Sequence, residues 1–297
     1  MQIFDKDKEY WLKRNKIKTS KYWKDAEKVE KRLIKEYGIA LKDLEKEFYA
    51  FSNKYGKNGK LNYSQRRILK LMRYLKEDID ELFDKNQITI TDYLSNLYED
   101  NYKRTLFDIS AGIGVASNFY KPDRQTIETI IKYEWNGENF SDTLWFNKQK
   151  LIRNLKKGII NSTIRGETPF ETAKFLSKVM KSSKIDTCRL CYTETTAVMS
   201  KSEEVAYKDW GVEKYEFLAT LDERTSEQCR NMDGRTFKVD KMIIGVNAPP
   251  LHVNCRSTTI PYIDNVFEKR IARRLDNDEV EYVGNITYNE WSKRFYK

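Results

Sequence analysis

The chain has 297 residues, a length that predicts about two domains. Charged residues make up 34% of it and aromatic residues 13%, a mixture that excludes a disordered chain and is typical of long, solvated amphipathic helices. The net charge of +10 favours a polyanionic partner, although a lysine-rich proteome would produce the same excess. No apolar run is long enough to span a membrane, and the N-terminus lacks the apolar core of a signal peptide.

The cysteine content indicates the compartment of synthesis. Four cysteines are too few for a disulfide scaffold of this size. We therefore expect synthesis in a reducing cytoplasm, where closely spaced cysteines indicate metal binding or chance.

The first part of the chain predicts helices. Apolar residues recur in steps of three and four over residues 22–51, which predicts one long helix with a single apolar stripe. The glycines of residues 55–60 end it. A second helix is expected after Ser64, a candidate N-cap, and a third from about Thr91. Hairpins of such helices indicate a bundle or an elongated arm, with the stripes as core.

Small residues at 110–117 predict a hinge or loop and a candidate domain boundary. They lack the G-x-G-x-x-G order of a phosphate-binding turn, and the sequence contains no P-loop motif, which excludes a P-loop ATPase. Further helices are expected near residues 123–134, 142–164, 168–181 and 185–208. Thr168, Pro169 and Glu171 carry the start signals of the third of these, including a capping box.

The pattern then changes from helical to alternating. Residues 214–222 predict a strand, Asp233-Gly234 a tight turn, and residues 235–239 a returning strand. Residues 286–297 predict a short amphipathic helix. The sequence thus predicts an α+β protein that is predominantly α-helical. We expect an N-terminal helical arm or bundle at 1–110, a central helical region at 111–210, a hairpin subdomain with a Cys/His cluster at 211–265, and a C-terminal tail with a short helix at 266–297.

The only histidine, His252, lies three residues before Cys255. This spacing brings an imidazole and a thiolate together, and zinc prefers four such ligands in a tetrahedral array. Cys229 and Asp222 complete a candidate set, Asp222 either as an oxygen ligand or as the partner of a ligand. A thiol hydrolase is the alternative, with Cys229 or Cys255 as the nucleophile, His252 as its base and Asp222 orienting the base. The pair Cys188–Cys191 is explained more simply as two small buried residues of one helix.

Residues 145–165 are rich in basic side chains and contain no acidic one. On a helix, one face carries apolar residues and another carries cations, so the helix can dock by one side and meet phosphate with the other. A solvated surface explains the same pattern. No motif for reading base sequence is present, so we expect non-specific DNA binding. The candidate DNA-binding residues are Lys148, Lys150, Arg153, Lys156 and Lys157.

An ordered series of short motifs resembles the phage minor head proteins, the head morphogenesis proteins of the SPP1 and phage Mu F type. The resemblance spans roughly residues 105–265 and the C-terminal segment. Its motif residues are Thr193-Glu194, Asp222-x-Arg224-Thr225, Cys229, Asp233-Gly234 and His252-x-x-Cys255-Arg256.

This resemblance implies a virion protein, a minor capsid protein that lies inside the capsid near the portal and is synthesised in the host cytoplasm. It implies roles in procapsid assembly and in DNA packaging or ejection. The implied partners are the portal protein, double-stranded DNA, and a scaffold or major capsid protein. The implied work is done by surfaces rather than by catalysis; a Cys–His hydrolase acting during assembly or entry is the alternative.

The sequence departs from the family pattern at two positions. The family often has D-x-R-T-C-x-x-C and H-x-x-C-R-C, which supply a metal knuckle, whereas Ser226 and Ser257 stand here in place of two of those cysteines. A structural zinc knuckle and a metal-free turn are both open. Without metal, Asp222 can cap its turn, and the arginines can pair with carboxylates such as Glu194.

Overall fold

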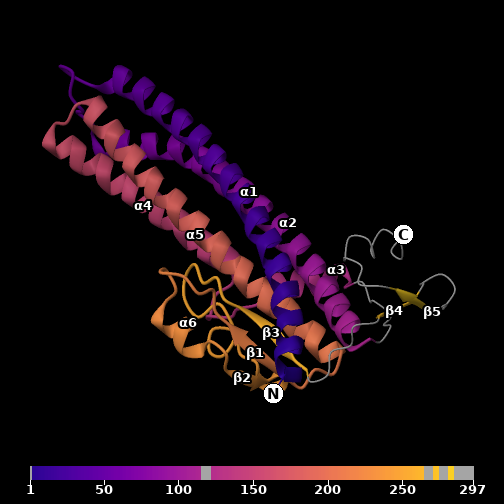
Figure 1. Cartoon of the computed structure of the whole chain (residues 1–297). Helices are drawn as coiled ribbons and strands as arrows, with labels where there is room; N and C mark the ends of the chain where they lie inside the picture. The colour runs from indigo at the N-terminus through magenta and orange to yellow at the C-terminus, as the bar shows by residue number, and fades with distance from the viewer. Residues whose placement is uncertain (1, 115–121, 264–269, 274–279, 284–297) are drawn as a thin grey trace. The chain divides into compact units, whose positions relative to one another are not determined.

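The computed structural model describes residues 2–114, 122–263, 270–273 and 280–283 (Figure 1). Within them, helices predominate and a three-stranded antiparallel sheet of order β2-β1-β3 follows, which confirms the predicted fold class. The elements are α1 (Gln2–Tyr55), α2 (Gln65–Ile113), α3 (Arg124–Ile131), α4 (Phe140–Arg165), α5 (Pro169–Asp209), β1 (Lys214–Leu218), α6 (Glu227–Met232), β2 (Thr236–Lys238), η1 (Val239–Lys241), β3 (Thr258–Tyr262), β4 (Arg270–Arg273) and β5 (Val280–Val283).

The chain groups into two compact units, each assembled from segments distant in sequence. Unit 1 comprises Met1–Asp25, Leu94–Asn136 and Tyr192–Lys297, and unit 2 comprises Ala26–Tyr93 and Gly137–Cys191. The four regions expected from the sequence remain a prediction. In the part of the chain that the structure describes, no helix combines the length and the apolar character needed to cross a bilayer.

Unit 2 is built from helical hairpins with an apolar core. The stripe predicted for the first helix is buried, and so are matching stripes on the other three helices, as ridge packing of amphipathic helices requires. The core includes Leu33, Leu44 and Phe48 of α1, Leu71, Leu75 and Ile79 of α2, Leu151, Leu155 and Ile159 of α4, and Leu176 and Met180 of α5.

The turn between α4 and α5 confirms the predicted capping box. The Thr168 N–H donates to the Glu171 carboxylate at 2.8 Å, and the Glu171 N–H donates to Thr168 Oγ1 at 3.2 Å. Pro169 is the first residue of α5, as predicted. Gly166 ends α4 in the left-handed conformation, with φ of 61°, which a residue with a Cβ adopts only at a cost.

Two predicted helix breaks are wrong. The second and third predicted helices form one helix, α2, and the helices expected at 168–181 and 185–208 form one helix, α5. Neither gap contains Gly or Pro, and polar residues in both gaps are packed: Asn86 is buried, and Ser183 bonds to the Tyr37 hydroxyl at 3.0 Å. The predicted hinge at 110–117 is helical to Ile113, and its remainder after Gly114 lies outside the described residues. The helix predicted at 286–297 lies outside them too.

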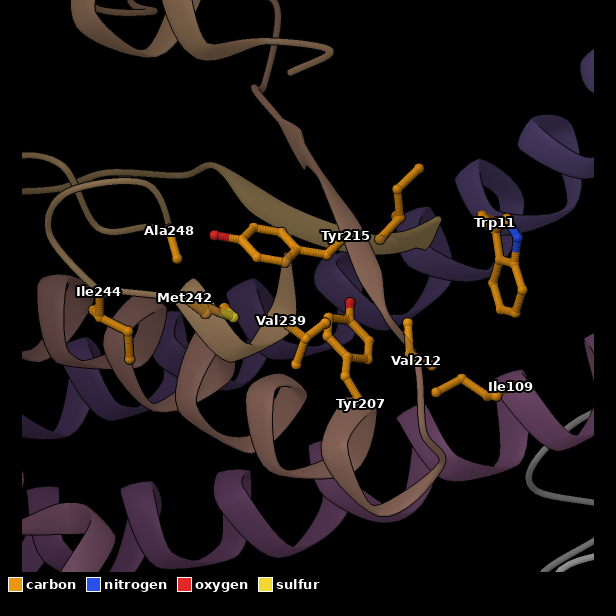
Figure 2. Packing of buried hydrophobic residues seen from close by; sticks show 10 residues of the cluster. Trp11, Ile109, Tyr207, Val212, Tyr215, Val239, Met242, Ile244 and Ala248 are labelled. Atoms are coloured by element: carbon orange, nitrogen blue, oxygen red, sulfur yellow. The ribbon is translucent and has the colours of Figure 1, made fainter. Parts of the chain in front are cut away.

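The sheet of unit 1 contains the two predicted strands, but β1 ends at Leu218 rather than at residue 222, and the unpredicted helix α6 lies between β1 and β2. β1 pairs with β2 in antiparallel register, with Tyr215 opposite Phe237. β3 was not predicted, and it pairs with the other edge of β1, with Tyr215 opposite Pro261. A buried apolar cluster covers the sheet, and Figure 2 shows how side chains from α1, α2 and α5 meet those of the sheet and the following loop. Its members are Trp11, Ile109, Tyr207, Val212, Tyr215, Val239, Met242, Ile244, Ala248 and Ile260.

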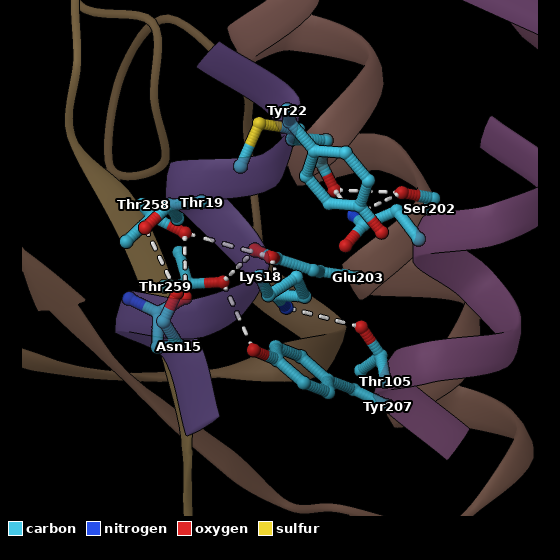
Figure 3. A network of polar contacts seen from close by, with 12 residues as sticks. Asn15, Lys18, Thr19, Tyr22, Thr105, Ser202, Glu203, Tyr207, Thr258 and Thr259 are labelled. Carbon is cyan, nitrogen blue, oxygen red and sulfur yellow. Dashed lines mark hydrogen bonds and ion pairs between the residues drawn. The ribbon is translucent and has the colours of Figure 1, made fainter. Parts of the chain in front are cut away.

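Beside this cluster lies a buried polar network (Figure 3). Lys18 of α1 forms an ion pair with Glu203 of α5 at 2.7 Å, and both side chains are almost fully buried. Thr105 of α2 accepts a hydrogen bond from the same ammonium group at 3.2 Å, and Thr259 of β3 donates to the Glu203 carboxylate at 2.7 Å. Four segments of unit 1 are therefore joined through two buried charges.

Candidate functional site

Three of the candidate metal ligands lie together in unit 1. The Cys229 sulfur lies 3.6 Å from the Cys255 sulfur and 3.2 Å from His252 Nε2. All three ligand atoms lie within 4.8 Å of one another. Both cysteines are buried, whereas His252 is half-buried at the rim. The cluster thus has an apolar inner side and one face near solvent.

Short α6 positions Cys229. Ser226 is the N-cap of α6, and its hydroxyl accepts the Cys229 N–H at 3.2 Å. Ser226 therefore fixes the first helical turn, in the manner of any Ser N-cap. This turn points the Cys229 side chain into a small core shared with Phe217, Ala219 and Cys255.

Helix α5 holds the second half of the cluster. Thr196 Oγ1 donates to the Cys255 carbonyl at 2.6 Å, and the Asn254 N–H donates to Thr193 Oγ1 at 3.0 Å. Asn254 adopts a φ of 58°, a left-handed conformation that Asn tolerates better than most residues. The loop carrying His252 and Cys255 is thereby fixed on a long helix.

The hydrogen bonds of His252 define the state of its ring. Its Nδ1 lies 2.9 Å from the Val253 carbonyl, which can only accept, so Nδ1 carries the proton. Nε2 therefore turns a free lone pair toward the two sulfurs. A carbonyl that orients a ligating imidazole in this way is a usual feature of metal sites.

The surroundings of Cys229 and Cys255 shift the pKa values of the two thiols in opposite directions. A hydrogen bond from the Cys255 thiol, followed by bonds from Ser226 and Ser257, lowers the pKa of Cys229 below its ordinary value against the effect of burial. That same hydrogen bond and burial raise the pKa of Cys255. The arrangement therefore favours a thiolate at Cys229.

The donor set fits zinc. At a Zn–S distance of about 2.3 Å, two thiolates of a tetrahedral site lie about 3.8 Å apart. The two sulfurs here are 3.6 Å apart, with an imidazole nitrogen beside them. The group of ligands found among the described residues holds three members, so the fourth position is left for water or another small donor.

Asp222 lies outside this group of ligands and stabilises the turn at residues 222–225, which precedes α6. Both of its oxygens accept from the Arg256 guanidinium, at 2.5 and 2.7 Å, which holds the pKa of Asp222 well below its usual range. Its Oδ1 also accepts the Arg224 N–H at 2.9 Å, and its own N–H donates to Thr225 Oγ1 at 2.9 Å. The D-x-R-T motif thus links the segment between β1 and α6 to Arg256, the residue that follows Cys255. Arg224 itself is exposed, 4.0 Å from Asp222.

The Asp233-Gly234 pair closes the hairpin. Asp233 accepts the Ala219 N–H at 2.8 Å, and the Gly234 N–H donates to the Phe217 carbonyl at 2.9 Å. Gly234 has a φ of 74°, so a side chain at this position would strain the turn. This confirms the predicted tight turn.

Glu194 bonds to Trp135 rather than to an arginine. The Trp135 indole N–H donates to its carboxylate at 3.1 Å, and burial raises the pKa of Glu194 to about 7. Sequence reasoning did not assign Trp135, because nothing in its neighbourhood of the sequence marks it. The nearby Gly245 lies against the same indole.

The candidate DNA-binding residues lie on α4 in unit 2. Lys148 forms an ion pair with Asp80 at 2.7 Å, and Lys150 forms one with Asp186 at the same distance. The other three, Arg153, Lys156 and Lys157, are exposed. The opposite face of α4 buries Leu144, Leu151, Leu155 and Ile159, as expected for a helix that docks by one side. Cys188 and Cys191 are buried in this same unit.

Comparison with known proteins shows that these motifs are similar to those of a known family. Residues 153–260, which run from α4 through β3 and include the Cys–His cluster, match the family model described as phage Mu protein F like protein. The chain thus resembles the phage Mu protein F like family over roughly a third of its length. This confirms the resemblance predicted from the motifs.

Two curated relatives extend over most of the chain. Minor head protein GP7 of Bacillus phage SPP1 is 26% identical over 284 residues, which cover 89% of this chain and 92% of that protein. The NAD(+)–arginine ADP-ribosyltransferase EFV of Enterococcus faecalis is 23% identical over 251 residues, 78% of this chain. The chain spans 50% of the length of that relative, so the activity in its name is that of a larger protein. No solved structure matches.

Proposed function

We propose that this chain is a minor head protein that acts structurally in the phage virion, at the portal vertex. It would serve in procapsid assembly and in the packaging or ejection of DNA, after synthesis in the host cytoplasm. The observation that carries the proposal is the similarity to minor head protein GP7, which covers 89% of this chain and 92% of that protein. A similarity of this extent includes segments of both units rather than one shared motif.

Association with the portal is the first test. The chain is co-expressed with the portal protein of the same phage, treated with nuclease so that DNA cannot bridge the two, and sedimented through a gradient. We expect co-migration with the portal ring. A chain that stays at the top of the gradient contradicts the placement at the portal. Addition of the scaffold or major capsid protein then tests whether the chain enters procapsids.

The exposed face of α4 supports contact with duplex DNA inside the head. Arg153, Lys156 and Lys157 are exposed and form no ion pair within the described part of the chain, so they are available to phosphate. Reversing the charge of these three residues and Lys150 to Glu is expected to weaken retention on duplex DNA at low salt. Unchanged retention removes this assignment.

For the cluster of Cys229, His252 and Cys255, we propose a structural zinc. The ion would cross-link α6 to the loop before β3, two segments that share only a small core. Structural zinc contributes folding free energy directly, since the ligands are brought together only in the folded chain. The fit of the sulfur spacing to zinc supports this role.

A thiol hydrolase is the second candidate, favoured by the 3.2 Å contact between Cys229 and His252. Three observations weigh against it. Cys229 is only 2% exposed, and His252 Nδ1 bonds to a carbonyl, whereas Asp222 is engaged by Arg256. Iodoacetamide labelling near neutral pH tests it: a hydrolase requires rapid labelling of Cys229 that is lost in His252→Ala, and slow labelling excludes it.

A further inference from the structure

The connection between α1 and α2 carries a long run of positive charge in unit 2. Residues 52–76 contain eight basic side chains and no acidic one: Lys54, Lys57, Lys60, Arg66, Arg67, Lys70, Arg73 and Lys76. The segment comprises the end of α1, the connection and the first turns of α2. It lies apart in sequence from the basic residues of α4.

Four of these cations line one depression. Arg66, Lys70 and Arg73 follow one another at intervals of four and three residues, so they share a face of α2. Together with Arg67, they surround a hollow of about 620 Å³ that is also lined by Tyr55, Ser64 and Leu69. The Arg67 guanidinium lies over the Tyr55 ring, 5.0 Å from its centroid, and this contact orients it along the hollow.

This charge is not neutralised by the protein. None of the four cations forms an ion pair within the described part of the chain, whereas Lys148 and Lys150 of α4 are each held by an aspartate. Arg66 and Arg67 also lie in the first turn of α2, which contains no acidic residue. Cations at a helix N-terminus are repelled by the positive end of the helix dipole and weaken the helix. An anion from outside the chain would reduce this repulsion and also the repulsion among the four cations.

The hollow is fixed on a rigid connection. The Leu61 N–H donates to the Glu167 carbonyl at 2.9 Å, which ties the connection to the α4–α5 turn. The Tyr63 hydroxyl donates to Ser52 Oγ at 2.7 Å, and both residues are buried. The cations are therefore presented on a preformed surface, which reduces the entropy lost on binding.

We propose that this hollow is a second DNA-binding site, which holds the phosphodiester backbone of duplex DNA. The helical rise from Arg66 to Arg73 extends about 10 Å along α2. One strand of duplex DNA carries a charge about every 3.4 Å of axis, so the row of cations spans about three phosphates. Arginine forks bind phosphate in two-point fashion, and the lining offers few groups that could read bases, so binding is independent of sequence. This inference rests on the proposed contact with DNA and assigns it a further surface.

A salt series tests the proposal. Binding of a labelled 30-base-pair duplex to the full chain is measured by fluorescence anisotropy between 50 and 200 mM salt. In the variant R66Q/R67Q/K70Q/R73Q, loss of about three phosphate contacts lowers the slope of log affinity against log salt by about 3. The affinity deficit relative to the unmodified chain is then about 40-fold larger at 50 mM than at 200 mM.

Two controls isolate the site. The variant K31Q/K35Q/K42Q/K46Q removes the same number of charges from exposed positions of α1 in the same unit, and its slope is expected to change by less than about 1. The variant R66K/R67K/R73K keeps the charge and is expected to keep the slope, which excludes a loss of binding through misfolding.

The outcomes separate this inference from the proposed function. A slope lost equally in the hollow variant and the α1 control overturns the hollow as a site, as does an unchanged slope. If the α4 variant alone loses binding, the contact with DNA stands and the second site falls. If the hollow variant instead loses binding to polyglutamate and keeps binding to DNA, the site serves an acidic protein, which contradicts the proposal.

Discussion

The two units of this chain are stabilised in different ways. Unit 2 buries apolar stripes and leaves its charges at the surface, where ion pairs such as Lys150–Asp186 are exposed. Unit 1 buries charged and polar groups, among them Lys18, Glu203 and Glu194, and fixes each with a partner from a distant segment. Surface pairs contribute little to stability, whereas a buried charge that loses its partner costs much. Single changes should therefore act far more strongly in unit 1.

The largest effect is expected at the Lys18–Glu203 pair. Lys18→Met leaves the Glu203 carboxylate buried without a cation, which should lower the free energy of unfolding by about 3–5 kcal/mol in urea titrations. The matched change Lys150→Met removes an exposed pair and should cost less than about 1 kcal/mol. The double variant Lys18→Met/Glu203→Leu should recover most of the loss. Equal costs in the two single variants would mean that the contrast between the units is wrong.

A pH-dependent effect is expected at Glu194. Its pKa is about 7 in the folded chain because of burial, above the ordinary value of 4.5. The unfolded chain therefore loses this proton first, and stability falls as pH rises from about 4.5 to about 7. The total loss is about 3 kcal/mol and is constant at higher pH.

Glu194→Gln removes this proton and keeps the acceptor for Trp135. The variant should match the unmodified chain near pH 4 and exceed it by roughly 2–3 kcal/mol at pH 8, as measured by urea unfolding at each pH. Parallel pH profiles of the two proteins would show that Glu194 titrates normally.

A smaller effect is expected at the start of α5 in unit 2. Thr168→Ala removes the capping hydroxyl and should cost about 1 kcal/mol, whereas Thr168→Ser should retain most of the stability. Because Thr168 is only half-buried and Glu171 is exposed, the cost should be a fraction of that at Lys18. The apolar packing of unit 2 implies that it tolerates a local change of this kind. A loss above about 3 kcal/mol in Thr168→Ala would contradict that.

The same contrast explains what the sequence could predict. The stripe at residues 22–51, the capping box at Thr168 and the β1–β2 hairpin are encoded by neighbouring residues, so local pattern was enough. The two wrong helix breaks lie at Asn86 and Ser183, polar residues whose packing depends on other helices and is not encoded by their neighbours in the sequence.

Long-range partners lay beyond sequence reasoning. Cys229, His252 and Cys255 were recognised as candidates because few residue types bind metal and because His252 lies three positions before Cys255. The bond between Trp135 and Glu194 joins residues 59 positions apart, and the pair of Lys18 and Glu203 joins residues 185 positions apart. β3 was missed because its burial is continuous over four residues and gives no alternation.

The central claim is that the Cys–His cluster is a structural zinc site rather than a catalytic pair. Elemental analysis of the purified, tag-free chain tests it directly. We expect about one zinc per chain, in keeping with the single three-residue group found among the described residues. The metal should be lost in Cys255→Ser and retained in Cys188→Ser, whose thiol is buried in unit 2. A zinc-free chain, purified without chelators, would contradict the claim and leave Cys229 and His252 as a free pair.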